Sequence, residues 1–190
     1  MASSEASLQE LTALLRRVDN RQQLAELISR YGMAVDDRDF DALGGMFAAD
    51  GEFHGVHGRQ AIIDYYRART ASFSTSSHYA HTWHFAFASD DRATGVVNAH
   101  AELCIDGKAV RIALRYLDTY VREGGAWRFL SRQLKFRYVL PFDEVADGIG
   151  QPFRVRWPGT APQAADLPDG LQSYQISRQQ PAVGVAPPKG

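Results

Sequence analysis

Features that define several large classes of proteins are scarce or missing in this chain of 190 residues. A single cysteine, Cys104, excludes an internal disulfide and fits a reducing compartment, so we expect a cytoplasmic protein. The N-terminal segment carries charges where a signal peptide needs an apolar core, and no apolar run approaches transmembrane length. The 21 basic and 22 acidic side chains balance to −1, so the sequence carries no electrostatic footprint for nucleic acid or an anionic membrane.

The motifs of the commonest cofactor and nucleophile chemistries are missing as well. No glycine-rich loop is built for phosphate, no dinucleotide fingerprint follows a strand, and no Ser or Cys lies in a nucleophile motif. Cys104 lies in the strand-like run AELCID, which is typical of a packed core thiol. Proton transfer without a cofactor is the simplest chemistry left, and we predict no cofactor.

The hydrophobic pattern places helices first and strands second. Helical spacing predicts four helices: about Ser7 to Val18, Asn20 to Asp36, a short one capped by Asp39, and roughly Arg59 to Thr70. Four runs rich in β-branched and aromatic residues follow Ser77, and the turns between them are too short for βαβ crossovers. We therefore predict an α+β fold, with a strongly curved mixed or antiparallel sheet that wraps around the helices and forms a cone with an internal pocket.

Composition divides the chain into three parts. We expect an N-terminal helical extension at 1–19, the cone domain at 20–145, and a Pro- and Gly-rich, partly irregular arm at 146–190. One function considered for the arm is to cover the pocket through Phe142, Phe153 or Trp157.

Asp36 is the candidate acid–base carboxylate. It ends the second predicted helix and lies about 100° around that helix from Val35, so it flanks the buried face. A carboxylate at the rim of an apolar face can point into a pocket and acquire a perturbed pKa. The alternative is that Asp36, like Asp37, Asp39 and Asp41, is a surface group at a helix junction.

The histidines supply the second candidate. His78, His81 and His84 stand three residues apart, and strand alternation would place His78 and His84 on one face and His81 on the other, with Trp83. Alternating faces oppose a zinc site, whose ligands must converge, so we predict no metal. A lone strand histidine is usually structural, whereas a neighbouring buried carboxylate fixes the tautomer and raises the basicity of the imidazole.

Tyr31 and Arg132 are further candidates. Tyr31 lies about 140° around an ideal helix from Asp36, so only the reach of its phenol or a loosened helix end would bring the two together. A core tyrosine is the alternative. Arg132 lies on the last predicted strand, where it either pairs with Asp36 inside the cone or is an exposed strand residue.

Residues 20–145 resemble the SnoaL-like domain of the cystatin-like cone superfamily, which also includes nuclear transport factor two. The resemblance is carried by LAELISRYGMAVDDRDFDALGGMFAADGEFHG, HYAH…FASDDRATG and YLDTYVREGGAWRFLSR. The nearest patterns belong to the lyase branch of scytalone dehydratase, bile acid 7α-dehydratase and hexachlorocyclohexane dehydrochlorinase. In that branch a catalytic Asp closes the helix before a D-W-D-type motif, and Asp36, before DRDFDAL, matches it.

The resemblance also assigns the other roles. His78 lies 17 residues before Gly95, the distance of the catalytic histidine in that branch, so it is favoured over His81. Tyr31 matches a tyrosine of the bile acid enzyme, and Arg132 matches an arginine of the dehydrochlorinase. Two pocket positions that are acidic or histidine in relatives are Ala101 and Leu103 in this chain, so we expect a different substrate.

What the resemblance implies is a cofactor-free lyase of the dehydratase type, or a related isomerase, acting on a small hydrophobic, polyketide-, steroid- or aromatic-like molecule. His78, polarised by Asp36, would remove a proton from carbon, Tyr31 or water would protonate the departing hydroxyl, and Arg132 would hold Asp36 ionised. The candidates for substrate contact are Phe53, Tyr66, His81, Trp83 and His100. A polyketide-type cyclase and a non-catalytic ligand-binding or dimerisation module are the alternatives. We expect a homodimer or homotrimer that associates through the outer sheet face.

Overall fold

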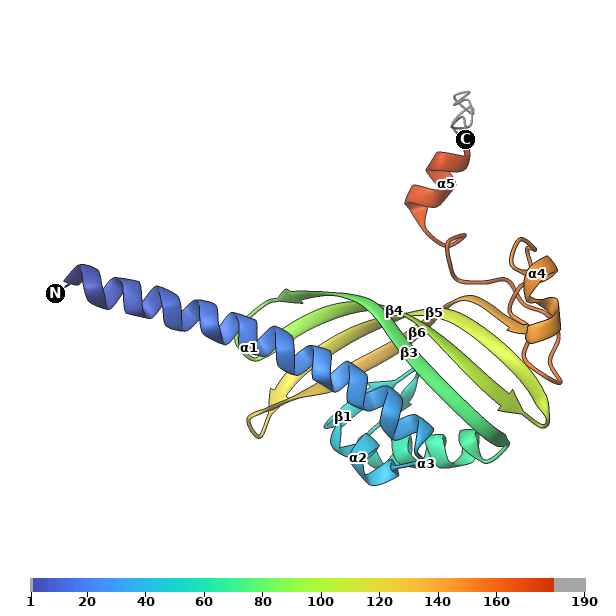
Figure 1. Ribbon diagram of the computed structural model, residues 1–190, viewed down its shortest axis with the longest axis horizontal. Coiled ribbons are helices and arrows are strands. Elements are labelled where there is room, and N and C mark those ends of the chain that lie inside the picture. The colour runs from blue at the N-terminus through green and yellow to red at the C-terminus, as the bar shows by residue number, and fades with distance from the viewer. Residues whose placement is uncertain (1, 180–190) are drawn as a thin grey trace, which may run out of the picture.

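Four long strands form most of the sheet in the computed structural model, which describes residues 2–179 (Figure 1). Each strand pairs antiparallel with the next, as the sequence predicts. The turns after the second and third of them contain glycines at positive φ, Gly107, Gly124 and Gly125. The strands are β3 (Phe73–Phe87), β4 (Arg92–Ile105), β5 (Lys108–Glu123) and β6 (Ala126–Pro141).

Two short strands from the first half of the chain complete the sheet. They are β1 (Phe47–Phe53) and β2 (Val56–His57), and the strand order is β2-β1-β6-β5-β4-β3. Because β1 runs parallel to β6, the sheet is mixed. Strand β3 lies at one border of this sheet and pairs with β4 alone.

Three helices precede or interrupt the strands and lie beside the curved sheet (Figure 1). They are α1 (Ala2–Asp36), α2 (Phe40–Gly45) and α3 (Arg59–Thr70). The predicted cap is confirmed, since the Asp39 carboxylate accepts a hydrogen bond from the backbone N–H of Ala42 at 2.9 Å. The C-terminal half of α1 buries one face at helical spacing: Leu24, Leu27, Ile28, Tyr31, Ala34 and Val35.

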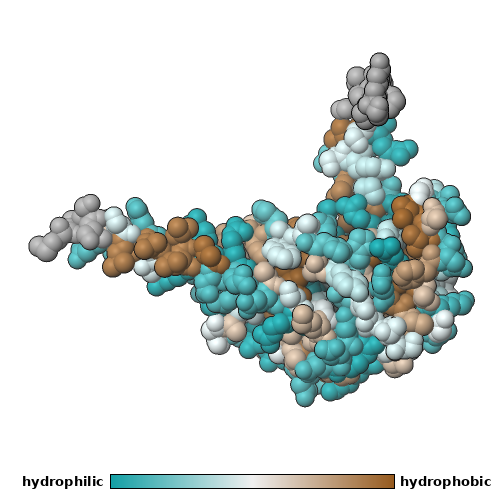
Figure 2. Space-filling model, viewed as in Figure 1, coloured by the Kyte–Doolittle hydropathy of each residue, from teal (hydrophilic) through white to brown (hydrophobic). Residues whose placement is uncertain are grey.

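The predicted break between the first two helices is wrong, because α1 is one helix of 35 residues. Asn20 does not cap a helix. Its side-chain oxygen instead accepts hydrogen bonds from the Trp127 indole, at 3.2 Å, and from the Arg122 guanidinium. Residues 5–19 are exposed and project from the body, and Figure 2 shows apolar side chains gathered on this projecting part. The exposed apolar residues of this segment are Leu8, Leu11, Leu14, Leu15 and Val18.

After β6 the chain folds back against the sheet before it leaves the body. It forms η1 (Phe142–Glu144) and α4 (Val145–Gly148), and later α5 (Gln172–Gln179). Between these helices Val155 bridges Val139 in a parallel pair and Gln163 in an antiparallel pair. The first part of the predicted arm is therefore packed on β6, while the end of the predicted arm, 180–190, lies outside the described residues.

No helix within residues 2–179 has the length and apolar character needed to cross a membrane.

Candidate active site

Asp36 and His78 form a doubly hydrogen-bonded pair. The imidazole Nδ1 of His78 lies 2.6 Å from Asp36 Oδ1, and the backbone N–H of His78 donates to Asp36 Oδ2 at 2.7 Å. Their side chains are only 20% and 17% exposed, respectively. The alternative in which Asp36 is a surface group is therefore wrong, and the histidine beside it is His78, the one that the resemblance favours as the catalytic residue, not His81.

Helix α1 reaches β3 closely because Gly32 stands at the crossing point. A Cβ at Gly32 would lie 3.4 Å from both the Cβ and the carbonyl oxygen of His78. Just beyond the helix end, the Arg38 guanidinium donates to the Val35 carbonyl at 2.6 Å and to Ser76 Oγ at 2.9 Å. These contacts fasten the end of α1 to β3 and fix the place of Asp36.

The electrostatics favour an ionised carboxylate. Burial raises the pKa of Asp36, but the hydrogen bonds and charge of His78 outweigh it, and the pKa lies below its ordinary value. An ionised Asp36 accepts the Nδ1–H of His78, which leaves Nε2 as the basic nitrogen of the ring. Nε2 has no hydrogen-bond partner within residues 2–179.

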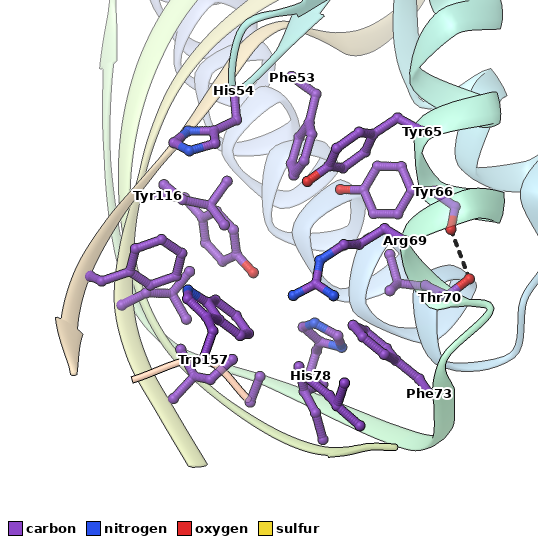
Figure 3. Close-up of a pocket in the computed structure, with 18 of the residues that line it drawn as sticks. Phe53, His54, Tyr65, Tyr66, Arg69, Thr70, Phe73, His78, Tyr116 and Trp157 are labelled. Atoms are coloured by element: carbon purple, nitrogen blue, oxygen red, sulfur yellow. Dashed lines mark hydrogen bonds between the residues drawn. The ribbon is translucent and has the colours of Figure 1, made fainter. Parts of the chain in front are cut away.

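His78 lies in the wall of a cavity of about 430 Å³ between the helices and the concave face of the sheet (Figure 3). A volume of this size suits a small molecule. The polar residues of the lining include Tyr31, Tyr66, Arg69 and Tyr116. The remaining wall is largely aromatic and aliphatic: Val35, Phe53, Phe73, Ala101, Leu103, Ile105, Ile112, Leu114, Leu134, Phe136 and Trp157.

Tyr31 and Tyr66 share a hydrogen bond in this wall, with 2.5 Å between their hydroxyl oxygens. Both are buried, and burial raises the pKa of each phenol above its ordinary value. Both therefore keep their protons at neutral pH and can donate them. Tyr31 is thus a cavity residue, although no hydrogen bond joins it to Asp36.

Arg132 does not pair with Asp36, and that prediction is wrong. Its guanidinium donates two hydrogen bonds of 2.9 Å to Asp118, and both side chains are fully buried. The antiparallel register of β5 and β6 places these two residues directly opposite each other. The guanidinium also lies 4.0–4.1 Å from the ring centroids of three aromatic residues, Tyr31, Tyr116 and Phe129.

Of the five residues predicted to contact substrate, Phe53 and Tyr66 line the cavity and three do not. His81 bonds His100 at 2.7 Å, and His100 pairs with Tyr79 on the face of the sheet away from His78, as strand alternation predicts for His81. An irregularity in β3 between Ala80 and Thr82 interrupts the alternation beyond it, so the predicted shared face of His78 and His84 is wrong: His84 lies with Val96 on the other face. Trp83 is 44% exposed and also lies outside the cavity lining.

Several cavity residues were not predicted. Arg69 follows Tyr65 and Tyr66 by four and three residues on α3, so helical spacing alone could have placed it on the same face. Among the three arm aromatics considered as a cover, Trp157 lines the cavity, whereas Phe142 and Phe153 are exposed. Within residues 2–179, no cluster of three or more His, Cys, Asp or Glu side chains is placed to bind a metal ion.

The sequence matches the model of the SnoaL-like domain over residues 16–133, which is more than half of the chain. The protein therefore belongs to the SnoaL-like family, and the predicted cone fold is confirmed. No curated protein matches the sequence.

Several solved structures share the fold. The crystal structure of LinA is 24% identical, with 69% of this chain and 95% of that chain covered and a TM-score of 0.65. The hexachlorocyclohexane dehydrochlorinase LinA-type3 from Novosphingobium barchaimii LL02 is 22% identical, with 69% and 95% covered and a TM-score of 0.64. A scytalone dehydratase-like protein from Novosphingobium aromaticivorans DSM 12444 is 18% identical, with 77% and 97% covered and a TM-score of 0.64.

Proposed function

We propose that the protein is a cofactor-free lyase that eliminates water or halide from a small hydrophobic molecule by Asp–His acid–base catalysis. The observation that carries the proposal is the Asp36–His78 pair, with bonds of 2.6 and 2.7 Å, in the wall of a cavity of about 430 Å³. Proteins of similar fold that are named as a dehydrochlorinase and as dehydratase-like support the same class of reaction.

In this mechanism His78 Nε2 takes a proton from carbon. The electron pair of that C–H bond forms a carbon–carbon double bond while the neighbouring bond to the leaving group breaks. A halide leaves as the anion, whereas a hydroxyl takes a proton from Tyr31, or from a water molecule, and leaves as water. Asp36 stabilises the imidazolium that forms on His78, since its carboxylate stays ionised.

Arg132 acts on this mechanism through Tyr31 instead of Asp36. Its guanidinium lies 4.1 Å from the centroid of the Tyr31 ring, and its partner Asp118 keeps it in place. Tyr66, bonded to Tyr31, can return a proton after Tyr31 has donated one. We therefore assign Arg132 as a positioning residue.

An isomerase would share the first step and return the proton to a different carbon, and a polyketide-type cyclase would use the same pair for ring closure. Product analysis separates these outcomes. A cavity filled by side chains and a separated Asp–His pair would favour a purely structural module. This protein instead has a cavity of about 430 Å³ and a distance of 2.6 Å between the two side chains, which supports a catalytic role.

The test uses hydrophobic carbon acids that carry a hydroxyl or halide on the neighbouring carbon, with release of water or halide as the readout. A group that transfers a proton contributes about 10²–10⁴-fold, so His78→Ala is expected to lose that factor. Asp36→Asn leaves the imidazolium without its carboxylate and is expected to lower turnover strongly as well, and both variants keep their fold by circular dichroism. His84→Ala, on the other face of the sheet, is the matched control and keeps full activity. A double variant at Asp36 and His78 with wild-type turnover would refute the mechanism.

We also propose that the protein is a cytoplasmic homodimer or homotrimer whose cone domain spans residues 20–145. The outer sheet face exposes Tyr79, Val96 and Leu117, which supports association there. Light scattering that gives the mass of one chain would contradict the oligomer.

A further inference from the structure

Arg69 is a charged residue of the cavity without a charged partner. It extends from the last turn of α3 to the middle of the cavity, between His78 and Tyr116 (Figure 3). Its Cζ lies 4.9 Å from the ring centroids of both Phe73 and Trp157. Within residues 2–179, the Arg69 guanidinium makes no hydrogen bond or ion pair.

Several other arginines that are shielded from solvent do have a carboxylate partner. Arg59, Arg132, Arg154 and Arg156 each pair with a carboxylate, whereas the cavity lining contains no Asp or Glu. A guanidinium in a largely apolar cavity has lost part of its hydration, and an anion that enters the cavity can replace it.

The donors of the guanidinium determine what kind of anion fits. Phe73 and Trp157 contact it through their aromatic rings, so its N–H groups remain available to a ligand. Donors in a planar fork match the two oxygens of a carboxylate. The surrounding wall of Ile105, Leu134 and Phe136 suits an apolar body attached to that carboxylate.

We propose that Arg69 binds the carboxylate of the substrate, so that the cavity selects small hydrophobic carboxylic acids over their uncharged analogues. That these acids are substrates rests on the proposed lyase function, whereas their selective binding does not. Trp157 belongs to the chain beyond β6, so the same contact makes that segment part of the binding site.

The probes are 2-naphthoate and its uncharged analogue 2-naphthamide, with binding to the full chain measured by isothermal titration calorimetry. The wild-type protein is expected to bind the carboxylate about tenfold or more tightly than the amide, the size of one charge-assisted hydrogen-bonded contact. Arg69→Gln is expected to remove this preference without weakening the binding of the amide. Arg67→Gln is the matched control, because Arg67 lies on the same helix with its side chain 50% exposed and pairs with Asp64; it keeps the preference.

Arg69→Lys provides a second test in case Arg69→Gln does not fold. It keeps the positive charge but not the planar set of N–H donors, so it is expected to retain only part of the preference for the carboxylate. A wild-type protein that binds both probes equally, or neither, overturns the proposal, and so does a folded Arg69→Gln variant that still prefers the carboxylate. His78→Gln separates this proposal from the proposed function. In this variant the preference is expected to stay and turnover to be lost. In the wild-type protein, intact preference with no turnover of any tested acid refutes the lyase alone, whereas turnover without preference refutes the carboxylate site alone.

Discussion

Replacement of Asp118 by Asn leaves the Arg132 guanidinium in the core without a carboxylate. Asp118 is 4% exposed and Arg132 0%, so water does not compensate the charge. Asp118 accepts two hydrogen bonds from Arg132 and one, at 2.7 Å, from Tyr120. Loss of one partner from a buried pair costs about 3–5 kcal/mol. At about 2–4 °C per kcal/mol for a chain of this length, the melting temperature is expected to fall by about 6–20 °C.

A double variant sharpens this prediction. Arg132→Met removes the charge and places an apolar side chain among the same aromatic rings. Asp118→Asn combined with Arg132→Met is therefore expected to be more stable than Asp118→Asn alone, by about 1 kcal/mol or more. Urea unfolding followed by circular dichroism measures all of these variants.

The matched control is Glu123→Gln, which removes ion pairs with Arg59 and Arg128 from a partly exposed site. Its cost is expected to stay below about 1 kcal/mol. The reasoning is refuted if Asp118→Asn lies within about 1 kcal/mol of the wild type, or if the losses from the two single variants simply add.

Three further predictions concern pH and packing. The pKa of Asp36 is lower in the folded than in the unfolded protein, so its contribution to stability is present above about pH 4 and is lost as the pH falls through the folded pKa. Urea unfolding between neutral and acid pH should therefore show that the stability difference between the wild type and Asp36→Asn shrinks towards acid pH. A stability difference that does not change with pH would contradict this. Burial raises the pKa of four tyrosines, Tyr31, Tyr66, Tyr116 and Tyr120, so their neutral form stabilises the fold below about pH 10. In an alkaline titration followed by ultraviolet absorbance, their phenolate signal should appear only as the protein unfolds, not before. Gly95→Ala would place a Cβ 2.7 Å from a Tyr120 ring carbon and is expected to lower the free energy of unfolding by about 1–3 kcal/mol, measured by thermal or urea unfolding. The control is Gly45→Ala, whose Cβ meets open space and should change stability little. Equal stabilities of the two variants would count against the packing argument.

The order of helices and strands could be predicted because it depends on local pattern. The apolar residues at helical spacing before Asp36 and the β-branched runs after Ser77 each specify an element, and short turns force neighbouring strands to pair antiparallel. The meeting of Asp36 and His78 was predicted from the resemblance, since periodicity alone left Asp36 as either a pocket or a surface group.

The errors arose where a contact depends on long-range geometry. The partner of Arg132 follows from the register of β5 against β6, which no single strand pattern specifies. The side of the sheet on which His84 lies depends on a one-residue irregularity in β3, and one such residue reverses the alternation beyond it. The helix break predicted at Asn20 is wrong because the Asn20 side chain does not cap a helix. It accepts a hydrogen bond from Trp127, a residue far away in the sequence.

The border position of β3 gives Asp36 two tasks. A border strand presents peptide N–H groups that can recruit a foreign extended chain, and at His78 that N–H is already occupied by the Asp36 carboxylate. The same oxygen pair that orients the imidazole therefore also shields the sheet from unwanted growth. A substitution that removes this acceptor, such as Asp36→Ala, should therefore promote aggregation, so solubility and the proposed acid–base role are under joint constraint at one side chain.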